Sequence, residues 1–132
     1  MENMKTLPLI HSYSRAQAVA DGVLIDVSAV AREAGFKVPV ALTAEVWADC
    51  VAWSAEDSLR QVTQDESGRL WDVLWMAFCA ARQAKGSQLA FHLYRVPRGG
   101  RKCMPRLTTL HLQIGPGDEL EPVITVLQPG QD

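Results

Sequence analysis

The stretch RLWDVLWMAFCAARQAKGSQLAFHLYRV (residues 69–96) carries the strongest structural signal in this sequence. In its first part, apolar residues lie three and four positions apart, which is the spacing of one face of an α-helix. One stripe on this face consists of Trp71, Leu74, Trp75 and Phe78. Further apolar residues widen the stripe until the segment is apolar nearly all round, as is typical of a buried central helix. We therefore expect a buried, Trp-rich helix over residues 69–85, capped by Asp65 or Ser67 and ended by Gly86.

Beyond Gly86 the apolar period changes from 3.6 to 2, which predicts β-strands. Apolar residues alternate over 89–93 and 110–114, a β-branched run covers 123–127, and glycines and prolines separate the three segments. We expect a three-stranded antiparallel meander with its apolar face against the helix. Alignment of the apolar residues on one face predicts these cross-strand pairs: Leu89 with Ile114, Phe91 with Leu112, Leu93 with Leu110, Leu112 with Ile124, and Leu110 with Val126.

The N-terminal half is predicted to contain short helices joined by extended segments. Helices are expected over 14–22, 29–34 and 43–52, with Ser14, Ser28 and Thr43 as their N-caps. Residues 23–27 are rich in β-branched residues and are expected to be extended. Residues 38–42 are expected to be extended because Pro39 disfavours helical geometry in the residue before it. The resulting fold class is α+β: N-terminal helices and one buried Trp-rich helix packed on a C-terminal three-stranded antiparallel β-meander, in a single domain over residues 1–132.

Composition places the chain among ordinary globular proteins. Its 132 residues are 48% hydrophobic and 21% charged, which is sufficient for one core and argues against a disordered chain. The longest charge-free apolar stretch covers only residues 73–81, whereas a membrane-spanning helix needs about 20. The apolar run after Lys5 is short and interrupted by Pro8, unlike a secretory signal. We expect a cytoplasmic protein without a membrane partner.

The three cysteines show neither a disulfide framework nor a zinc motif. Cys50, Cys79 and Cys103 are an odd set without a close pair. We expect Cys50 and Cys79 to be small core residues and Cys103 to be a loop thiol.

Two histidines are the best candidates for chemistry. His92 and His111 become cross-strand neighbours in the predicted register, but no carboxylate lies between Asp72 and Asp118 to provide a third local metal ligand. Neither a nucleophile motif nor a cofactor motif is present. We expect no metal, no cofactor and no catalytic residues, and a small hydrolase or metal enzyme around these histidines remains the enzymatic alternative.

The four tryptophans and one acid within the helical pattern allow two interpretations each. The spacing of Trp47, Trp53, Trp71 and Trp75 favours core positions, with Trp53 the most exposed, over an aromatic surface that stacks on bases or on a partner. Asp72 either needs a buried partner such as an arginine or faces solvent in the first turns of its helix.

Charge is distributed unevenly along the chain. Residues 73–117 carry seven basic side chains and no acid, whereas 1–72 and 118–132 have net charges of −5 and −4. Most of these basic side chains flank the tip of the predicted hairpin, and the candidate partner-binding residues are Arg95, Arg98, Arg101, Lys102 and Arg106. Arginines in such a ribbon can bind carboxylates or phosphates through paired hydrogen bonds.

Three interpretations of this basic tip remain. It is a solvated hairpin whose charges prevent sheet-to-sheet pairing, a docking site for acidic protein, or a nucleic-acid-binding ribbon. Self-association through the acidic residues 118–132 of a second chain belongs to the second class. The pI of about 5.9 argues against nucleic acid, because dedicated DNA-binding domains are usually basic overall. An acidic protein surface or self-association is therefore preferred to nucleic acid.

Several segments resemble a small bacterial domain family of unknown function that is carried on plasmids and integrative mobile elements. They are DGVLIDV (21–27), AGFKVPVALT (34–43), VWADCV (46–51), GRLWDVLWMA (68–77), IGPGD (114–118) and EPVIT (121–125). The resemblance implies a mobile-element setting and no particular activity, and it provides no functional residues. We expect a non-enzymatic interaction protein of the accessory or counter-defence type, which docks through the basic hairpin.

Overall fold

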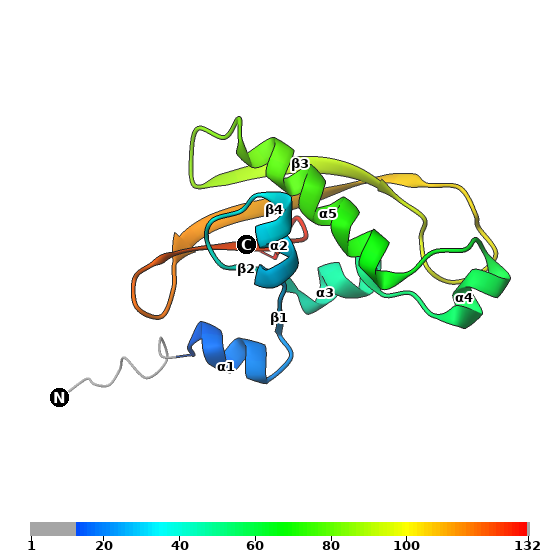
Figure 1. The fold of residues 1–132 in the computed structure, drawn as a ribbon, viewed down its shortest axis with the longest axis horizontal. Coiled ribbons are helices and arrows are strands. Elements are labelled where there is room, and N and C mark those ends of the chain that lie inside the picture. The colour runs from blue at the N-terminus through cyan, green and yellow to red at the C-terminus, as the bar shows by residue number, and fades with distance from the viewer. Residues whose placement is uncertain (1–12, 132) are drawn as a thin grey trace.

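The computed structural model describes residues 13–131, so the signal-peptide expectation at the N-terminus lies outside the described residues. The helices are α1 (Arg15–Ala20), α2 (Ser28–Ala34), α3 (Ala44–Val46), the π-helical segment η2 (Trp47–Val51), α4 (Ala55–Arg60) and α5 (Glu66–Ala81). The strands are β1 (Leu24–Asp26), β2 (Val40–Thr43), β3 (Gln88–Arg95), β4 (Arg106–Pro116) and β5 (Pro122–Leu127). The α+β class is thus confirmed (Figure 1).

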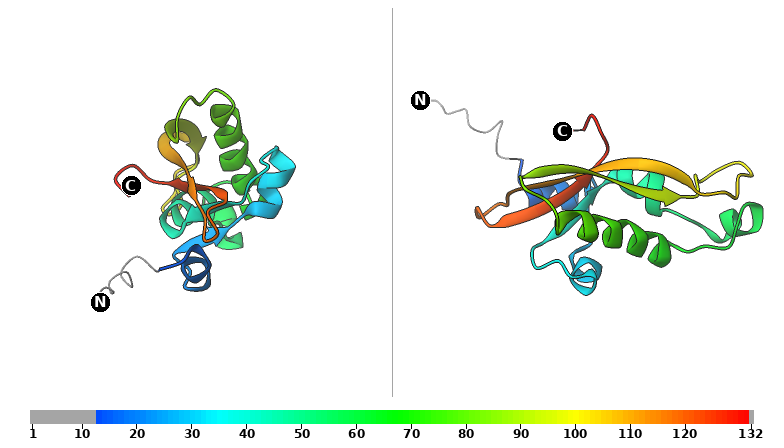
Figure 2. Two further views of the ribbon diagram at one scale, coloured as in Figure 1. Left: turned by 90° about the vertical axis from the view of Figure 1, so that its left-hand side faces the viewer. Right: turned by 90° about the horizontal axis from the view of Figure 1, so that it is seen from above.

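Within the described residues, the strands form one mixed sheet in the order β1-β2-β5-β4-β3. The sheet therefore has two strands more than the three predicted, because β1 and β2 extend the meander beyond β5. The pairing of β2 with β5 is parallel and joins segments more than 80 positions apart in the sequence. Short runs such as 24–26 and 40–43 carry too little periodicity to reveal a distant partner. Helices α2 and α5 lie on one face of the sheet (Figure 2).

The predicted strand registers are wrong by two residues. Phe91 lies opposite Leu110 instead of Leu112, and Leu112 lies opposite Val126 instead of Ile124. A shift of two leaves every side chain on its original face, because side chains alternate with a period of two. The apolar face was therefore predicted correctly, although alternation alone could not distinguish the two registers.

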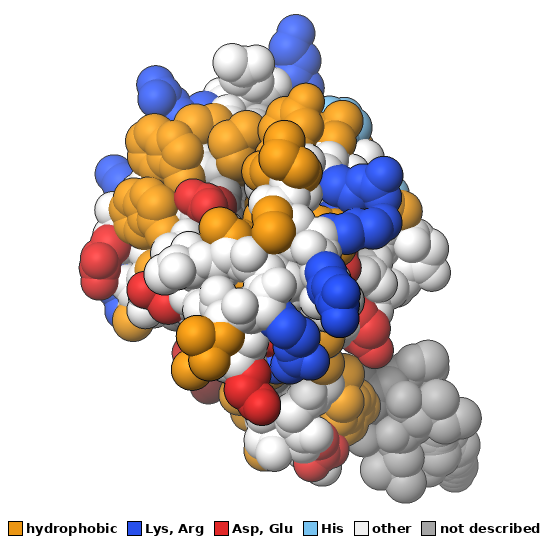
Figure 3. Space-filling view, turned by 90° about the vertical axis from the view of Figure 1, so that its right-hand side faces the viewer, with side chains coloured by type: hydrophobic (Ala, Val, Ile, Leu, Met, Phe, Trp, Pro, Cys, Tyr) orange, Lys and Arg blue, Asp and Glu red, His pale blue; other side chains and the backbone are white. Residues whose placement is uncertain are grey.

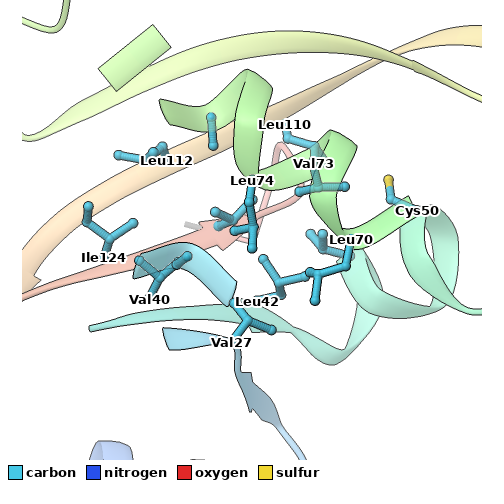
Figure 4. Close-up of a cluster of buried hydrophobic side chains, with 14 of the residues drawn as sticks. Val27, Val40, Leu42, Cys50, Leu70, Val73, Leu74, Leu110, Leu112 and Ile124 are labelled. Carbon is cyan, nitrogen blue, oxygen red and sulfur yellow. The ribbon is translucent and has the colours of Figure 1, made fainter. Parts of the chain in front are cut away.

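Helix α5 buries one face, whereas burial on nearly all sides was predicted. Asp65 is the N-cap and accepts a hydrogen bond from Gly68 N at 2.7 Å, and the helix ends at Ala81, four residues before the expected end. Its buried apolar residues are Leu70, Val73, Leu74 and Ala77. Trp71 and Trp75 remain 38% and 45% exposed, so the two tryptophans of the predicted stripe lie on the surface, whereas Leu74 of the same stripe is buried. Buried side chains of α5 and of the sheet meet in the core (Figure 4).

The N-terminal helices follow their caps, with two corrections. Ser14 and Thr43 accept hydrogen bonds from Gln17 N and Val46 N, as N-caps do. Ser28 is instead the first residue of α2, and its hydroxyl accepts from Val40 N at 3.0 Å. The helix after Thr43 changes to π geometry over η2, and this change is not visible in the apolar spacing.

Trp53 is 6% exposed, which corrects the expectation that it is the most exposed tryptophan. Its indole N–H donates to the Ser58 hydroxyl at 3.0 Å, and the Arg69 guanidinium lies 4.5 Å above its ring. A buried indole needs such a partner for its N–H. Trp53 is therefore a buried residue that holds α4 in place through Ser58, and it is not part of the surface.

Candidate interaction surface

The five predicted cations divide into two groups, and Arg95 belongs to the group that is used internally. It lies opposite Arg106 at the end of the β3–β4 ladder, and its Nη2 contacts both carboxylate oxygens of Asp49 at 3.1 Å. The ion pair is partly buried, since the Arg95 side chain is 16% exposed. Arg95 therefore ties the hairpin to η2 and offers little charge to a partner.

Arg98 is neutralised in the same way. Its Nε donates to the Asp57 carboxylate at 2.6 Å, and the Asp57 side chain is 8% exposed. Asp57 also closes a capping box with Ser54 at the start of α4. Burial alone would raise the pKa of Asp57, but hydrogen bonds from Ser54 and Arg98 outweigh it and hold this pKa below its usual value. The hairpin is thus joined to α4 through a charged contact.

The connection between β3 and β4 is held by Gln61, the residue after α4. The Gln61 side-chain amide donates to the carbonyls of Pro97 and Lys102, and its Oε1 accepts from Gly99 N at 2.9 Å. The Cys103 thiol donates to the Gln61 backbone carbonyl at 3.0 Å. Gly99 adopts a φ of 101°, which a side chain would disfavour. The connection is therefore fixed against α4 at the end of the molecule shown in Figure 3.

Arg101, Lys102 and Arg106 form the second group. All three are exposed, and their side chains make no ion pair or hydrogen bond with any of residues 13–131. Basic side chains gather beside apolar ones on this end of the molecule (Figure 3). We call these three residues the free cations, and they are the part of the predicted site that is available to a partner.

Arg69 supports this end of the molecule from inside and is not among the residues predicted from the sequence. The side chain is 4% exposed, and its guanidinium donates to the carbonyls of Val51 at 3.1 Å and Val96 at 2.9 Å. It also bonds the Gln64 side chain and the Asp49 carbonyl. Burial lowers the pKa of Arg69, yet an arginine stays charged at neutral pH. Its position four residues before Val73 was the available signal, because it falls on the buried face of α5.

An apolar groove lies between α5 and the hairpin. Its volume is about 400 Å3, and it is lined by Asp72, Trp75, Met76, His92, Leu93, Tyr94 and Leu107. Tyr94 is 67% exposed and Leu107 56%, so the groove is open to solvent. Desolvation raises the pKa of Asp72, although the Arg69 charge opposes this shift. A mostly apolar groove that is open to solvent is typical of a binding surface.

The predicted histidine pair is not formed. His92 lies opposite Thr109, and its Nδ1 is 2.9 Å from the Thr109 hydroxyl, whereas His111 lies opposite Ala90. The two-residue register shift separates the pair. Among residues 13–131, no group of three His, Cys, Asp or Glu side chains could hold a metal ion.

The cysteines differ in environment. Cys50 is 1% exposed, and burial, with a smaller contribution from Asp49, raises its thiol pKa to about 12. Cys79 is half-buried and Cys103 is exposed on the hairpin connection. The core position of Cys50 and the loop position of Cys103 are therefore confirmed.

Comparison with known proteins identifies a family and no activity. The whole chain, residues 1–132, matches a family of unknown function, DUF6573, and the chain belongs to this family. No curated protein and no solved structure matches the chain. In the part of the chain that the structure describes, no helix has both the length and the apolarity needed to cross a membrane.

Proposed function

We propose that this member of the family of unknown function is a non-enzymatic interaction protein of a bacterial mobile element, of the accessory or counter-defence type. It docks on an acidic protein surface through Arg101, Lys102 and Arg106. The observation that carries the proposal is that these three cations are exposed without partners among residues 13–131. Arg101 and Lys102 lie on the connection that Gln61 and Arg98 hold in place, and Arg106 begins β4 directly after it. The mobile-element setting is supported by the sequence resemblance alone.

The surface has the two components of a protein interface. Arginine and aromatic side chains are enriched where proteins bind one another, and an apolar centre with a polar rim is the common arrangement. Here the groove provides Trp75, Met76 and Leu107, and the free cation Arg106 directly precedes Leu107 in the chain. Complementary charge on the partner would speed association and select against basic surfaces.

Self-association is the weaker form of this proposal. Asp118 accepts from Arg15 N at 2.7 Å and Ala16 N at 3.0 Å, and Glu121 accepts from Glu119 N at 2.9 Å. Part of the acidic segment is thus engaged within its own chain. An acidic surface on a different protein is the better partner.

Charge reversal tests the site. We expect the double variant Arg101→Glu, Lys102→Glu to capture at least about tenfold less of its partner from host lysate than the unmodified chain. The control is Arg32→Glu, Lys37→Glu, which changes the net charge equally at exposed positions around the end of α2. Equal capture by both variants would reject this surface.

Single-stranded nucleic acid is the second candidate, favoured by one observation. Trp71 and Trp75 stack on the surface of α5, with ring centroids 6.2 Å apart and planes 10° apart, and exposed indoles beside cations can stack on bases. This function predicts retardation of a single-stranded oligonucleotide at low salt and a binding constant that falls steeply as salt rises. Unretarded single- and double-stranded probes would eliminate it.

A further inference from the structure

Strand β3 forms one edge of the sheet, and its outer side is open. Within residues 13–131, β3 pairs only with β4. The Ser87 carbonyl accepts from Ile114 N at 2.7 Å, which continues the β3–β4 register by one residue. In an antiparallel pair, residues alternate between those that bond the neighbouring strand and those that face away. The backbone N–H and C=O groups of Ala90, His92 and Tyr94 therefore point to the open edge.

Arg69 sets the end of this edge. Its Nη1 donates to the Val96 carbonyl at 2.9 Å, which is the next backbone group in the same outward-facing series. The strand edge is thus closed by α5 at Val96 and open from Ala90 to Tyr94. An open stretch of this length can accept a short extended segment of about five residues.

The apolar groove runs beside this open stretch. It is lined on one side by Trp75 and Met76 of α5, and on the other by Tyr94 and Leu107 of the hairpin. Side chains of a strand added to β3 would alternate between the helix side and the outer face of the sheet. An apolar side chain would therefore enter the groove while the backbone bonds the edge.

Charge identifies the kind of segment. Arg82 and Lys85 are exposed before β3, Arg101 and Lys102 lie on the connection after its other end, and Arg106 lies opposite its last residue. Asp72 lines the groove, so carboxylates are favoured beside the basic flanks and disfavoured at the side chain that enters the groove. The β3 strand of a second copy would bring the same basic flanks and be repelled.

We propose that an extended segment of a partner protein adds to β3 as a further strand, with apolar residues at its centre and acidic residues at both ends. The backbone hydrogen bonds provide affinity, and the groove and the basic flanks provide specificity, as in other cases of strand addition. The preference for an acidic segment rests on the proposed function, whereas the backbone pairing rests on the open edge.

The test uses a fluorescein-labelled synthetic heptapeptide with two acidic residues at each end and three apolar residues at its centre. Two further versions carry N-methyl groups on alternate peptide nitrogens, one on each of the two alternating sets. In an added strand, one set of N–H groups faces β3 and the other faces solvent. Fluorescence anisotropy should show that one version binds at least about tenfold more weakly than the parent and that the other binds nearly as well.

A matched pair of variants locates the groove. Leu107→Glu places a charge in the groove, and Leu59→Glu places the same charge on α4, where Leu59 is 89% exposed. We expect the first variant to weaken binding of the parent peptide at least about tenfold and the second to change it little. Circular dichroism melting of both variants verifies that they are folded.

The outcomes separate strand addition from charge-driven docking. Equal binding of both N-methylated peptides, combined with weaker binding to Arg101→Glu, Lys102→Glu, overturns strand addition and leaves the acidic docking site intact. No binding of the parent peptide at millimolar concentration also overturns strand addition, while the lysate capture comparison still decides the proposed function. If Arg101→Glu, Lys102→Glu captures less partner from lysate but binds the parent peptide as well as the unmodified chain does, strand addition is supported. The free cations are then rejected as the basic groups that attract the acidic ends of the added segment.

Discussion

The two edges of the sheet differ in how they are protected. The β1 edge has only three strand residues, and helix α1 packs against it. The β3 edge has eight strand residues, and its outward backbone groups from Ala90 to Tyr94 lie beside an apolar groove. Proteins usually shorten, cover or charge their edges, because an open edge pairs with other chains. The β3 edge uses charge at its ends and leaves its centre open, which suits selective binding.

Removal of Arg69 should produce the largest change in the contrast between the β1 and β3 edges. The loss of this side chain lengthens the open part of β3 and leaves buried carbonyls without a donor. We expect Arg69→Ala to lower the free energy of unfolding by about 3–5 kcal/mol, measured by urea denaturation. Arg69→Lys keeps the charge but loses the forked geometry, and should recover only part of the loss. Exposed Arg60→Ala is the control, and a similar loss in both alanine variants would contradict the role of Arg69.

Hydrogen exchange should sharpen the comparison within β3 itself. Backbone N–H groups of Phe91 and Leu93 bond β4, whereas those of Ala90, His92 and Tyr94 face the edge. We expect the second group to exchange at least about 100-fold faster than the first. Uniform protection along β3 would show that the edge is already covered.

Removal of the Gln61 side chain, which holds the β3–β4 connection, should lower stability less than removal of Arg69. We expect Gln61→Ala to lower the free energy of unfolding by about 1–2 kcal/mol, because two backbone carbonyls lose their donor. Amide exchange at Gly99 should accelerate in the same variant. Exposed Gln83→Ala should change neither quantity, and an equal response would argue that Gln61 does not fix the connection.

The smallest expected effect is a loss of stability at the α4 end of the molecule as the pH falls. The pKa of Asp57 is lowered in the folded state, so its stabilising contribution is present above the pKa of an unfolded aspartate, about 3.9, and is lost as pH falls through the folded value. Asp57→Asn should therefore flatten the dependence of stability on pH below about pH 4. An unchanged slope in urea melts across this range would contradict the Arg98–Asp57 contact as its source.

Local patterns predicted much of the fold, and distant contacts account for most of the rest. The helix at 66–81 and the two long strands follow from apolar spacing that a few neighbouring residues determine. The parallel pairing of β2 with β5 depends on a contact between distant segments, and their short patterns do not specify it. The exposure of Trp71 and Trp75 was missed because apolar spacing shows which residues share a face, not how wide the buried part is.

The candidate site was predicted by charge counting, but the count could not assign roles to its members. Arg95 and Arg98 are neutralised by Asp49 and Asp57, which lie more than 40 positions away in the sequence. One local signal was present, because Ser54 and Asp57 have the spacing of a capping box and place this carboxylate at the start of a helix. Its contact with the hairpin depends on the tertiary fold.

The most direct test is a titration of the 15N-labelled chain with the acidic heptapeptide, followed by amide and indole chemical shifts. We predict that the perturbed signals cluster at Ala90, His92, Tyr94 and the free cations, together with the Trp75 indole N–H. Signals of α1 and β1 should remain unchanged, because the pockets beside α1 include the carboxylates of Asp118 and Glu121, which would repel an acidic peptide. Perturbations centred on α1 and β1, or spread evenly over the surface, would contradict the assignment of the β3 edge and its basic hairpin as the binding surface.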